Sequence, residues 1–234
     1  MSKIIFVTGA EKGIGRAIAI HAAEEGHKLI LHSHNEEKLH DLTKILDKLE
    51  CAYLSSTFEL DDYDAYARVV EIAASKFEKI DALINTENLL YAASIKEMTA
   101  EDFDRMWRVN VKGVFNGVHL LTPLLKEQED GGDIVNIIST AGKVGLENKS
   151  GYSATMFAVR GFAQAIAKEV ASYGIRVMNF FPGFIIQDKN GTEVALEQEK
   201  LLKPEDVAQT VLNAIAMHKR AIITEMDIYP SNFN

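Results

Sequence analysis

The sequence has few of the features that mark secreted or membrane proteins. It contains one cysteine, Cys51, so an internal disulfide is excluded, and with it a small secreted fold held by disulfides. It has no run of about 18 apolar residues and no apolar segment behind a basic start. We therefore expect no membrane partner, no secretory signal and a cytoplasmic location.

Positive charge is also scarce. The chain has 25 Lys and Arg against 34 Asp and Glu, which gives a formal net charge of −9 at pH 7, and its basic residues do not cluster. A protein that binds a nucleic-acid backbone needs a concentrated Lys and Arg surface to replace the counterions. Nucleic acid is therefore excluded as the expected partner.

The 234 residues, 47% of them hydrophobic, are enough for one complete core. Short apolar runs alternate along the chain with stretches of helical periodicity, the pattern of a parallel sheet covered on both faces. We predict one α/β domain, a doubly wound (Rossmann-type) parallel sheet of about seven strands with helices on both faces. The expected strands are residues 3–7, 28–32, 52–55, 80–84, 133–138, 175–181 and 221–228.

The turn after the first strand is rich in glycine. Glycines at this point permit a tight turn and close backbone approach, so that N–H groups at the start of the next helix face a pyrophosphate. A simple turn is the alternative, but the loop lies where a first strand meets a first helix, which is the context that a dinucleotide site requires. The residues of this motif are Thr8, Gly9, Lys12, Gly13, Ile14 and Gly15.

Further motifs follow in a fixed order. Asn110 lies in a long middle helix, Ser139 closes the fifth strand, Tyr152 follows it, and the Pro182-Gly183 pair ends the sixth strand. Together with the T-G-x-x-x-G-x-G spacing of the loop, this order resembles the short-chain dehydrogenase/reductase family over nearly the whole chain. Each residue alone has an ordinary structural explanation, as a cap, a helix polar group or a packed aromatic. Their joint order makes coincidence remote.

The resemblance implies that residues 1–234 form one NAD(P)-binding domain and that Ser139, Tyr152 and Asn110 are catalytic. Ser139 would bond the substrate carbonyl oxygen, Tyr152 would deliver or remove the hydroxyl proton, and Asn110 would hold a water and the helix geometry. Hydride would pass between NAD(P)(H) and a small carbonyl or alcohol substrate. The family also implies a homodimer or homotetramer built through the helices near residues 103–125 and 152–172.

The chain departs from the family at the fourth residue after Tyr152. The family carries a lysine there, which grips the ribose hydroxyls and stabilises tyrosinate, whereas this chain carries Met156. A thioether has no charge, so we expect Tyr152 to titrate near its free pKa of about 10. Alcohol oxidation should then be badly impaired and carbonyl reduction less so. Lys143 and Lys149, on the loop before Tyr152, are alternative cations or simply solvated charges.

A second departure follows the fourth strand. The family usually has Asn-Asn-Ala-Gly, but this chain has Asn-Thr-Glu-Asn at residues 85–88, so Glu87 brings a carboxylate to the approach of a phosphate or ribose. Gln187 stands where many relatives use a threonine against the nicotinamide amide, and Glu59 stands at the aspartate position near the adenine. The cofactor residues implied outside the glycine loop are His34, Glu59, Asn85, Pro182, Gly183 and Gln187.

The choice of cofactor follows from charge at the end of the second strand. An NAD site has an acid there, and this chain has His32-Ser33-His34-Asn35. Lys12 and His34 are candidates to meet a 2′-phosphate, so NADP(H) is favoured over NAD(H), although Lys12 as a solvated loop charge is the alternative. The seven histidines show no metal-ligand spacing, and no metal site is expected.

Three functions remain open on the sequence. The first is an NAD(P)(H)-dependent oxidoreductase of reduced efficiency that acts through Ser139 and Tyr152. The second is a catalytically inactive dinucleotide sensor or regulatory protein, which Met156 and Glu87 favour. The third is a scaffold of the same fold that binds no cofactor.

Overall fold

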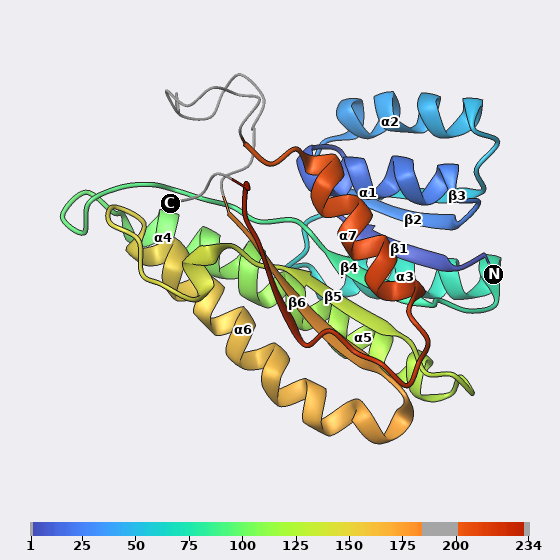
Figure 1. Cartoon of the computed structure of the whole chain (residues 1–234). Coiled ribbons are helices and arrows are strands. Elements are labelled where there is room, and N and C mark those ends of the chain that lie inside the picture. The colour runs from blue at the N-terminus through green and yellow to red at the C-terminus, as the bar shows by residue number, and fades with distance from the viewer. Residues whose placement is uncertain (1, 184–200, 232–234) are drawn as a thin grey trace.

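A parallel sheet of seven strands forms the centre of the molecule (Figure 1), and the computed structural model describes residues 2–183 and 201–231. The strand order is β3-β2-β1-β4-β5-β6-β7, and each neighbouring pair is parallel. This confirms the predicted fold class. The strands are β1 (Ile4–Thr8), β2 (Lys28–Ser33), β3 (Tyr53–Thr57), β4 (Ala82–Asn85), β5 (Asp133–Ile137), β6 (Arg176–Pro182) and β7 (Glu225–Ile228).

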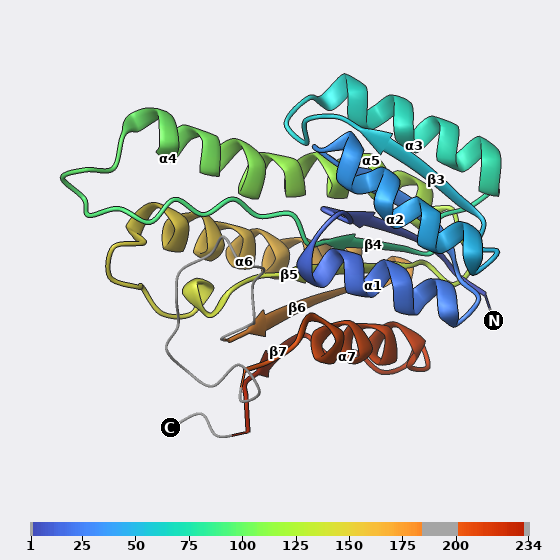
Figure 2. The same ribbon diagram turned by 90° about the horizontal axis from the view of Figure 1, so that it is seen from above.

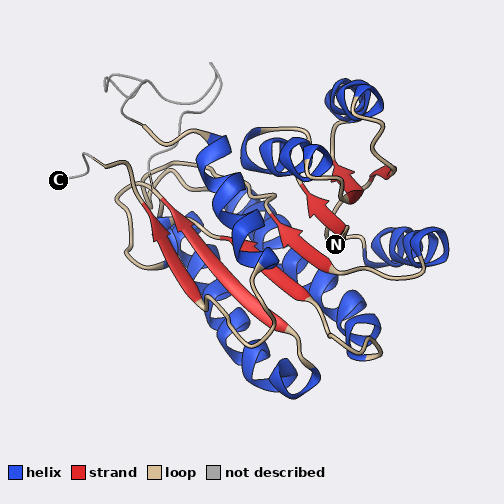
Figure 3. Cartoon of the chain, turned by 45° about the vertical axis from the view of Figure 1, so that its right-hand side comes forward, coloured by secondary structure: helices blue, strands red, loops and turns tan. Residues whose placement is uncertain are grey.

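Helices cover both faces of the sheet (Figures 2 and 3). One core cluster joins α1, α2 and α7 to the sheet, and a second joins α3, α4, α5 and α6 to the other face. The helices are α1 (Gly13–Glu24), α2 (Glu36–Lys48), α3 (Tyr63–Phe77), α4 (Ala100–Trp107), α5 (Gly113–Lys126), α6 (Ser150–Val170) and α7 (Pro204–Ala216), with short 3₁₀ turns at Thr140–Gly142 and Ala171–Tyr173. Within these described ranges, none of the helices combines the length and the apolar character needed to cross a membrane.

The central strands are mostly apolar because the helices leave neither face to water. Every residue of β1, β4, β5 and β6 is buried, as expected for parallel strands between two helical layers. The edge strand β3 is only half buried. The order of the strands reverses between β1 and β4, where crossovers leave the sheet in opposite directions. In open α/β sheets such a switch point, at the carboxyl ends of the strands, is where ligands bind.

The long middle helix predicted from the sequence is present but interrupted. Thr99 caps its start, because the Thr99 hydroxyl accepts a hydrogen bond of 3.0 Å from the Asp102 N–H. Between α4 and α5 the chain forms one π turn over Arg108–Lys112, and the turn contains Asn110. Such turns insert an extra residue into a helix and are frequent at functional sites.

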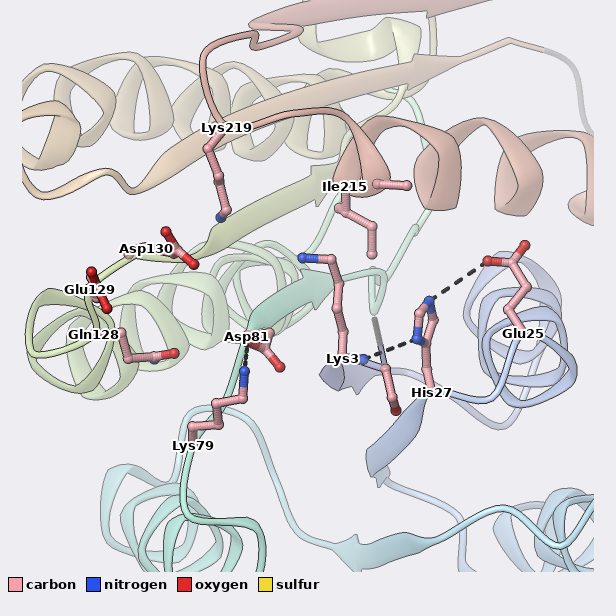
Figure 4. Close-up of a pocket in the computed structure, with 13 residues that line it drawn as sticks. Lys3, Glu25, His27, Lys79, Asp81, Gln128, Glu129, Asp130, Ile215 and Lys219 are labelled. Atoms are coloured by element: carbon pink, nitrogen blue, oxygen red, sulfur yellow. Dashed lines mark hydrogen bonds and ion pairs between the residues drawn. The ribbon is translucent and has the colours of Figure 1, made fainter.

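A polar cavity of about 740 Å³ lies at the opposite end of the sheet, where the strands begin (Figure 4). Several of its charged side chains are paired: Lys79 contacts Asp81 at 2.7 Å, and the His27 ring lies 3.7 Å from Glu25 and accepts a hydrogen bond from the backbone N–H of Lys3. Because ligands of such sheets bind at the carboxyl ends, we assign this cavity a structural role.

Candidate active site

The start of α1 is open to an anion. Lys12 is the cap residue and its side chain makes no capping bond, so it offers no acceptor to the first N–H groups of the helix. A Cβ added to Gly13 would have no heavy atom of the described part of the chain within 4 Å. Unsatisfied N–H groups with open space in front of them are the features that a phosphate needs. These residues fit the pyrophosphate of a dinucleotide.

Two glycines of the loop are required by close backbone approach. A Cβ on Gly15 would lie 2.2 Å from the Gly9 carbonyl oxygen, and Gly9 itself has a φ of 64°. Thr8 is buried, and its hydroxyl accepts a hydrogen bond of 3.2 Å from the Thr86 N–H after β4. The loop and the β4 turn are therefore one packed unit. Ile14 is half buried against the α1 side of the core.

His32 anchors the glycine loop through a hydrogen bond, and the sequence did not indicate this role. Its Nδ1 accepts from the Gly9 N–H at 3.3 Å, so its Nε2 carries the proton and donates to the Phe58 carbonyl at 2.8 Å. Burial lowers the pKa of His32 to about 4, although the hydrogen bond to Phe58 acts in the opposite direction. The imidazole is therefore neutral at pH 7. Only the packing of β2 against the loop reveals this role.

Four charged side chains meet beside the loop. The Lys12 ammonium lies 2.9 Å from Glu87 Oε1 and 3.7 Å from Glu11 Oε1. His34 Nδ1 lies 3.4 Å from Glu11 Oε1 and 3.9 Å from Glu87 Oε2. The side chain of Glu11 is fully buried and that of Glu87 is 7% exposed. We call Glu11, Lys12, His34 and Glu87 the loop charge cluster.

The cluster gives Lys12 and His34 acidic neighbours that the sequence did not indicate. Both are candidates to meet a 2′-phosphate, and in the structure both face carboxylates. Burial opposes the charge of Lys12, but Glu87 and Glu11 outweigh it and raise the Lys12 pKa. Burial raises the pKa of Glu87, and Glu11 adds to that effect while Lys12 opposes it. Glu87 also covers Gly9, where the sequence had indicated an obstacle to the cofactor.

Ser139 and Tyr152 come together at the same edge of the sheet. Ser139 follows β5 and caps the short turn Thr140–Gly142, with its Oγ accepting from the Ala141 N–H at 3.2 Å. Tyr152 lies in the first turn of α6, and its phenol interacts with the Ser139 side chain. Burial raises the pKa of Tyr152 to about 12, and the interaction with Ser139 offsets this only in part. The expected value of about 10 was therefore wrong, because the sequence could not show how deeply the ring is buried.

Asn110 and Met156 complete the surroundings of the pair. Asn110 exchanges hydrogen bonds with the Leu89 backbone, accepting at 2.7 Å and donating at 2.9 Å, and it donates to Thr155 Oγ1 at 3.0 Å. It thus ties the π turn to the segment after β4 and to α6. Met156 is 3% exposed and belongs to the apolar core. Lys143 is engaged elsewhere, in an ion pair of 2.7 Å with Asp227.

Three asparagines form a row across the neighbouring strands β4, β5 and β6. The sequence did not indicate this row. Asn85 donates to Asn136 Oδ1 at 2.9 Å, and Asn136 donates to Asn179 Oδ1 at 3.0 Å, all three being buried. The residues are direct neighbours in the registers of β4, β5 and β6. The side chain of Asn85, expected at the cofactor, is thus part of this row.

The remaining predicted cofactor residues lie near the same edge, with one exception. Pro182 ends β6, and the Gly183 N–H bonds to the Ile228 carbonyl at 2.8 Å. Gly183 also adjoins the Tyr229 ring, which lies 2.7 Å from a Cβ built on it. Glu59 is exposed just after β3. Gln187 lies outside the described residues.

Comparisons with known proteins agree with this geometry. A sequence model of the short chain dehydrogenase family matches residues 3–198. The chain is 34% identical over 219 residues to a 3-oxoacyl-(acyl-carrier-protein) reductase of Thermotoga maritima, which covers 90% of this chain and 89% of the relative. It is 30% identical over 229 residues to an uncharacterized oxidoreductase of Staphylococcus saprophyticus, with 97% of each chain covered.

Solved structures share the fold. An alcohol dehydrogenase from Thermococcus sibiricus, complexed with 5-hydroxy-NADP, superposes with a TM-score of 0.90 at 22% identity, over 100% of this chain and 99% of that one. A metagenomic short-chain oxidoreductase in complex with NADP gives 0.86 at 23% identity, over 98% and 97%. With the family match over most of the chain and the sheet edge described above, this protein belongs to the short-chain dehydrogenase family of oxidoreductases.

Proposed function

We propose that this protein reduces a small carbonyl compound with a nicotinamide dinucleotide as hydride donor. The observation that carries the proposal is the adjacent pair of Ser139 and Tyr152, at the same sheet edge as the uncapped start of α1. Family membership supports it, as do the T. maritima relative, which is named a reductase, and two structural neighbours in complex with NADP or a derivative.

Ser139 and Tyr152 act on the carbonyl oxygen of the substrate. When bound at the glycine loop, a nicotinamide dinucleotide would supply the hydride that the carbonyl carbon receives. The Ser139 hydroxyl donates a hydrogen bond to the carbonyl oxygen, and Tyr152 gives its phenolic proton to that oxygen, which yields the alcohol. The pKa of about 12 keeps Tyr152 protonated at pH 7, so the acid for reduction is fully present.

The same environment lowers the efficiency of the step. Tyr152 becomes an anion as it gives up its proton, and the buried neighbour one turn along α6 is the thioether of Met156. A missing charge partner in general acid catalysis costs about 10²–10⁴ in rate. We therefore expect slow reduction and still slower oxidation.

NADP(H) remains the preferred cofactor in this proposal. The acid that bonds the ribose of NAD is missing at the end of β2, where His34 stands instead. Lys12 lies between the α1 start and Glu87. To contact a 2′-phosphate, its ammonium has to exchange the Glu87 carboxylate for the phosphate. This exchange predicts weaker binding than in a loop without Glu87.

A sensor that binds a dinucleotide without turnover is the second candidate. Two observations favour it: Met156 is buried in the apolar core, and Glu87 covers Gly9. The open space at Gly13 favours retained binding over the third possibility, a scaffold without cofactor.

Binding and turnover measured separately decide between the three. NADPH and NADH are titrated into the protein by calorimetry, and NADPH consumption is then followed over a panel of small aldehydes, ketones and 3-oxoacyl thioesters. Turnover that disappears in Tyr152→Phe and falls sharply in Ser139→Ala supports the reductase. Binding without turnover supports the sensor, and no binding at millimolar dinucleotide leaves only the scaffold.

We also propose a homodimer or homotetramer in the cytoplasm. Large apolar side chains are exposed on α4, α5 and α6, the helices that the family uses for assembly, which supports this state. They are Phe103, Trp107, Phe115 and Phe157. Light scattering of the wild type and of Phe115→Glu tests the assembly, which should dissociate in the variant.

A further inference from the structure

The loop charge cluster contains two buried acids that its basic residues do not satisfy. Glu11 is fully buried in its side chain, and neither of its carboxylate oxygens has a hydrogen-bond partner among residues 2–183 and 201–231. Glu87 Oε2 is buried and equally unpartnered within these ranges. The contacts of Glu11 are ion pairs at 3.4 and 3.7 Å, longer than a charge-assisted hydrogen bond. Buried carboxylates in this state normally pair closely or coordinate a metal.

The ligand atoms are close enough to share one cation. One atom each from Glu11, His34 and Glu87 lies within 4.8 Å of the others. Ligand atoms held about 2.0–2.2 Å from a tetrahedral metal ion stand roughly 3.4 Å apart, so the widest pair of the cluster has to close by up to about 1.4 Å. The His34 side chain is 47% exposed and has room for that movement.

We propose that Glu11, His34 and Glu87 bind a divalent transition-metal cation such as Zn²⁺ beside the glycine loop. Two carboxylates and one imidazole suit Zn²⁺ or Mn²⁺ better than Mg²⁺, which prefers oxygen ligands in octahedral geometry. Three protein ligands leave a coordination position for water. The site requires no dinucleotide and is independent of the proposed reduction.

The sequence had led us to expect no metal site, because its histidines lack ligand spacing. The fold explains the difference. The three ligands follow β1, β2 and β4, which are adjacent parallel strands that end at the same edge, while in the sequence they are 23 and 53 residues apart. A search for short ligand spacings in the sequence finds ligands that lie on one helix or hairpin. It misses ligands that follow different strands and come together only at the edge of a sheet.

Replacing Lys12 tests the proposal, because this change should tighten metal binding. Its ammonium occupies the cluster at 2.9 Å from Glu87 Oε1, so a cation has to displace it from that carboxylate. Removing the ammonium with Lys12→Met should therefore tighten metal binding several-fold. Variants that merely disturb the loop weaken binding instead.

Calorimetry with Zn²⁺ alone, on protein freed of any histidine tag, measures the site. We expect one equivalent per chain and at least tenfold weaker binding in Glu11→Gln and in His34→Ala. Glu25→Gln is the matched control, because Glu25 pairs with His27 at 3.7 Å at the other end of the sheet, and it should bind as the wild type does. Circular dichroism checks the fold, and the exposed His34 provides a ligand variant that does not threaten it.

Four results overturn the proposal. Three of them are no binding at millimolar Zn²⁺, binding of equal strength in His34→Ala, and weaker binding in Lys12→Met. The fourth comes from Mn²⁺ and Mg²⁺ titrations, since Mg²⁺ binding as tightly as Zn²⁺ contradicts a site that depends on the imidazole.

Discussion

Glu87 lies directly over Gly9, so closely that a Cβ on Gly9 would stand 2.6 Å from Glu87 Oε2 and 2.9 Å from Glu87 Cα. Glu87 thus places a buried carboxylate at the glycine loop, against the surface that a bound dinucleotide would contact. The Lys12 bond holds that carboxylate in place.

Replacing Glu87 by alanine should therefore tighten NADPH binding. The change removes a negative charge from the approach of the phosphates and frees Lys12, and we expect the Kd to fall about tenfold, which corresponds to about 1.4 kcal/mol. Calorimetric titration measures it. Glu97→Ala is the control, because Glu97 is exposed and accepts only from Ser94. An unchanged or higher Kd in Glu87→Ala refutes the view that Glu87 obstructs the cofactor.

Met156→Lys should raise the rate of carbonyl reduction by at least about tenfold, because an ammonium one turn from Tyr152 stabilises the phenolate that forms. Met156→Leu keeps an apolar side chain and should leave the rate unchanged. Steady-state kinetics compares the three proteins. Since Met156 is buried, the lysine should also lower stability by about 1–3 kcal/mol, which urea unfolding measures. A folded lysine variant with no gain in rate shows that charge is not the limiting deficiency.

The two reaction directions should differ in their pH dependence. Reduction uses the neutral phenol, which is present at all pH values below about 12, so its rate should be flat between about pH 6 and 9. Oxidation uses the phenolate, so its rate should rise about tenfold per pH unit over the same range. Initial rates in both directions test this, with Tyr152→Phe inactive throughout. An oxidation profile that levels off near neutral pH would show that another group is the base.

Stability should fall in mild acid because of His32. Its pKa is lowered from 6.5 to about 4 in the folded protein, so the unfolded chain takes up a proton first as the pH falls. The stabilisation is complete above pH 6.5 and is lost as the pH falls to about 4. Its size is about 3 kcal/mol, from the depressed pKa. Urea unfolding at several pH values measures it, and His32→Gln should flatten the slope. An identical slope in the variant assigns the effect to other groups.

The fold was predictable because apolar residues recur with different periods in its strands and in its helices. Strand positions agree to within a few residues, as for β2, expected at 28–32 and found at Lys28–Ser33. The last strand was expected from residue 221 and begins at Glu225, because an apolar run does not show where hydrogen bonding to β6 starts. The π turn at Arg108–Lys112 was missed for a similar reason, since one extra residue hardly alters the apolar pattern.

The candidate site was predictable only where a motif names the residue. The family resemblance implied that Ser139 and Tyr152 share one site, and in the structure their side chains interact. His32 and Glu11 were missed because their roles depend on burial and on contacts between segments distant in the sequence. The pKa of Tyr152 depends on the same kind of information.

The π turn also fixes which side of α4 meets the core. An α-helix turns about 100° per residue, so deleting one residue from Arg108–Lys112 would restore regular helix and swing α4 through roughly that angle relative to α5. Met106, now fully buried, would leave the interior, and the exposed Trp107 face would point in a new direction. A single codon lost here would thus redirect a helix two turns long without changing its sequence.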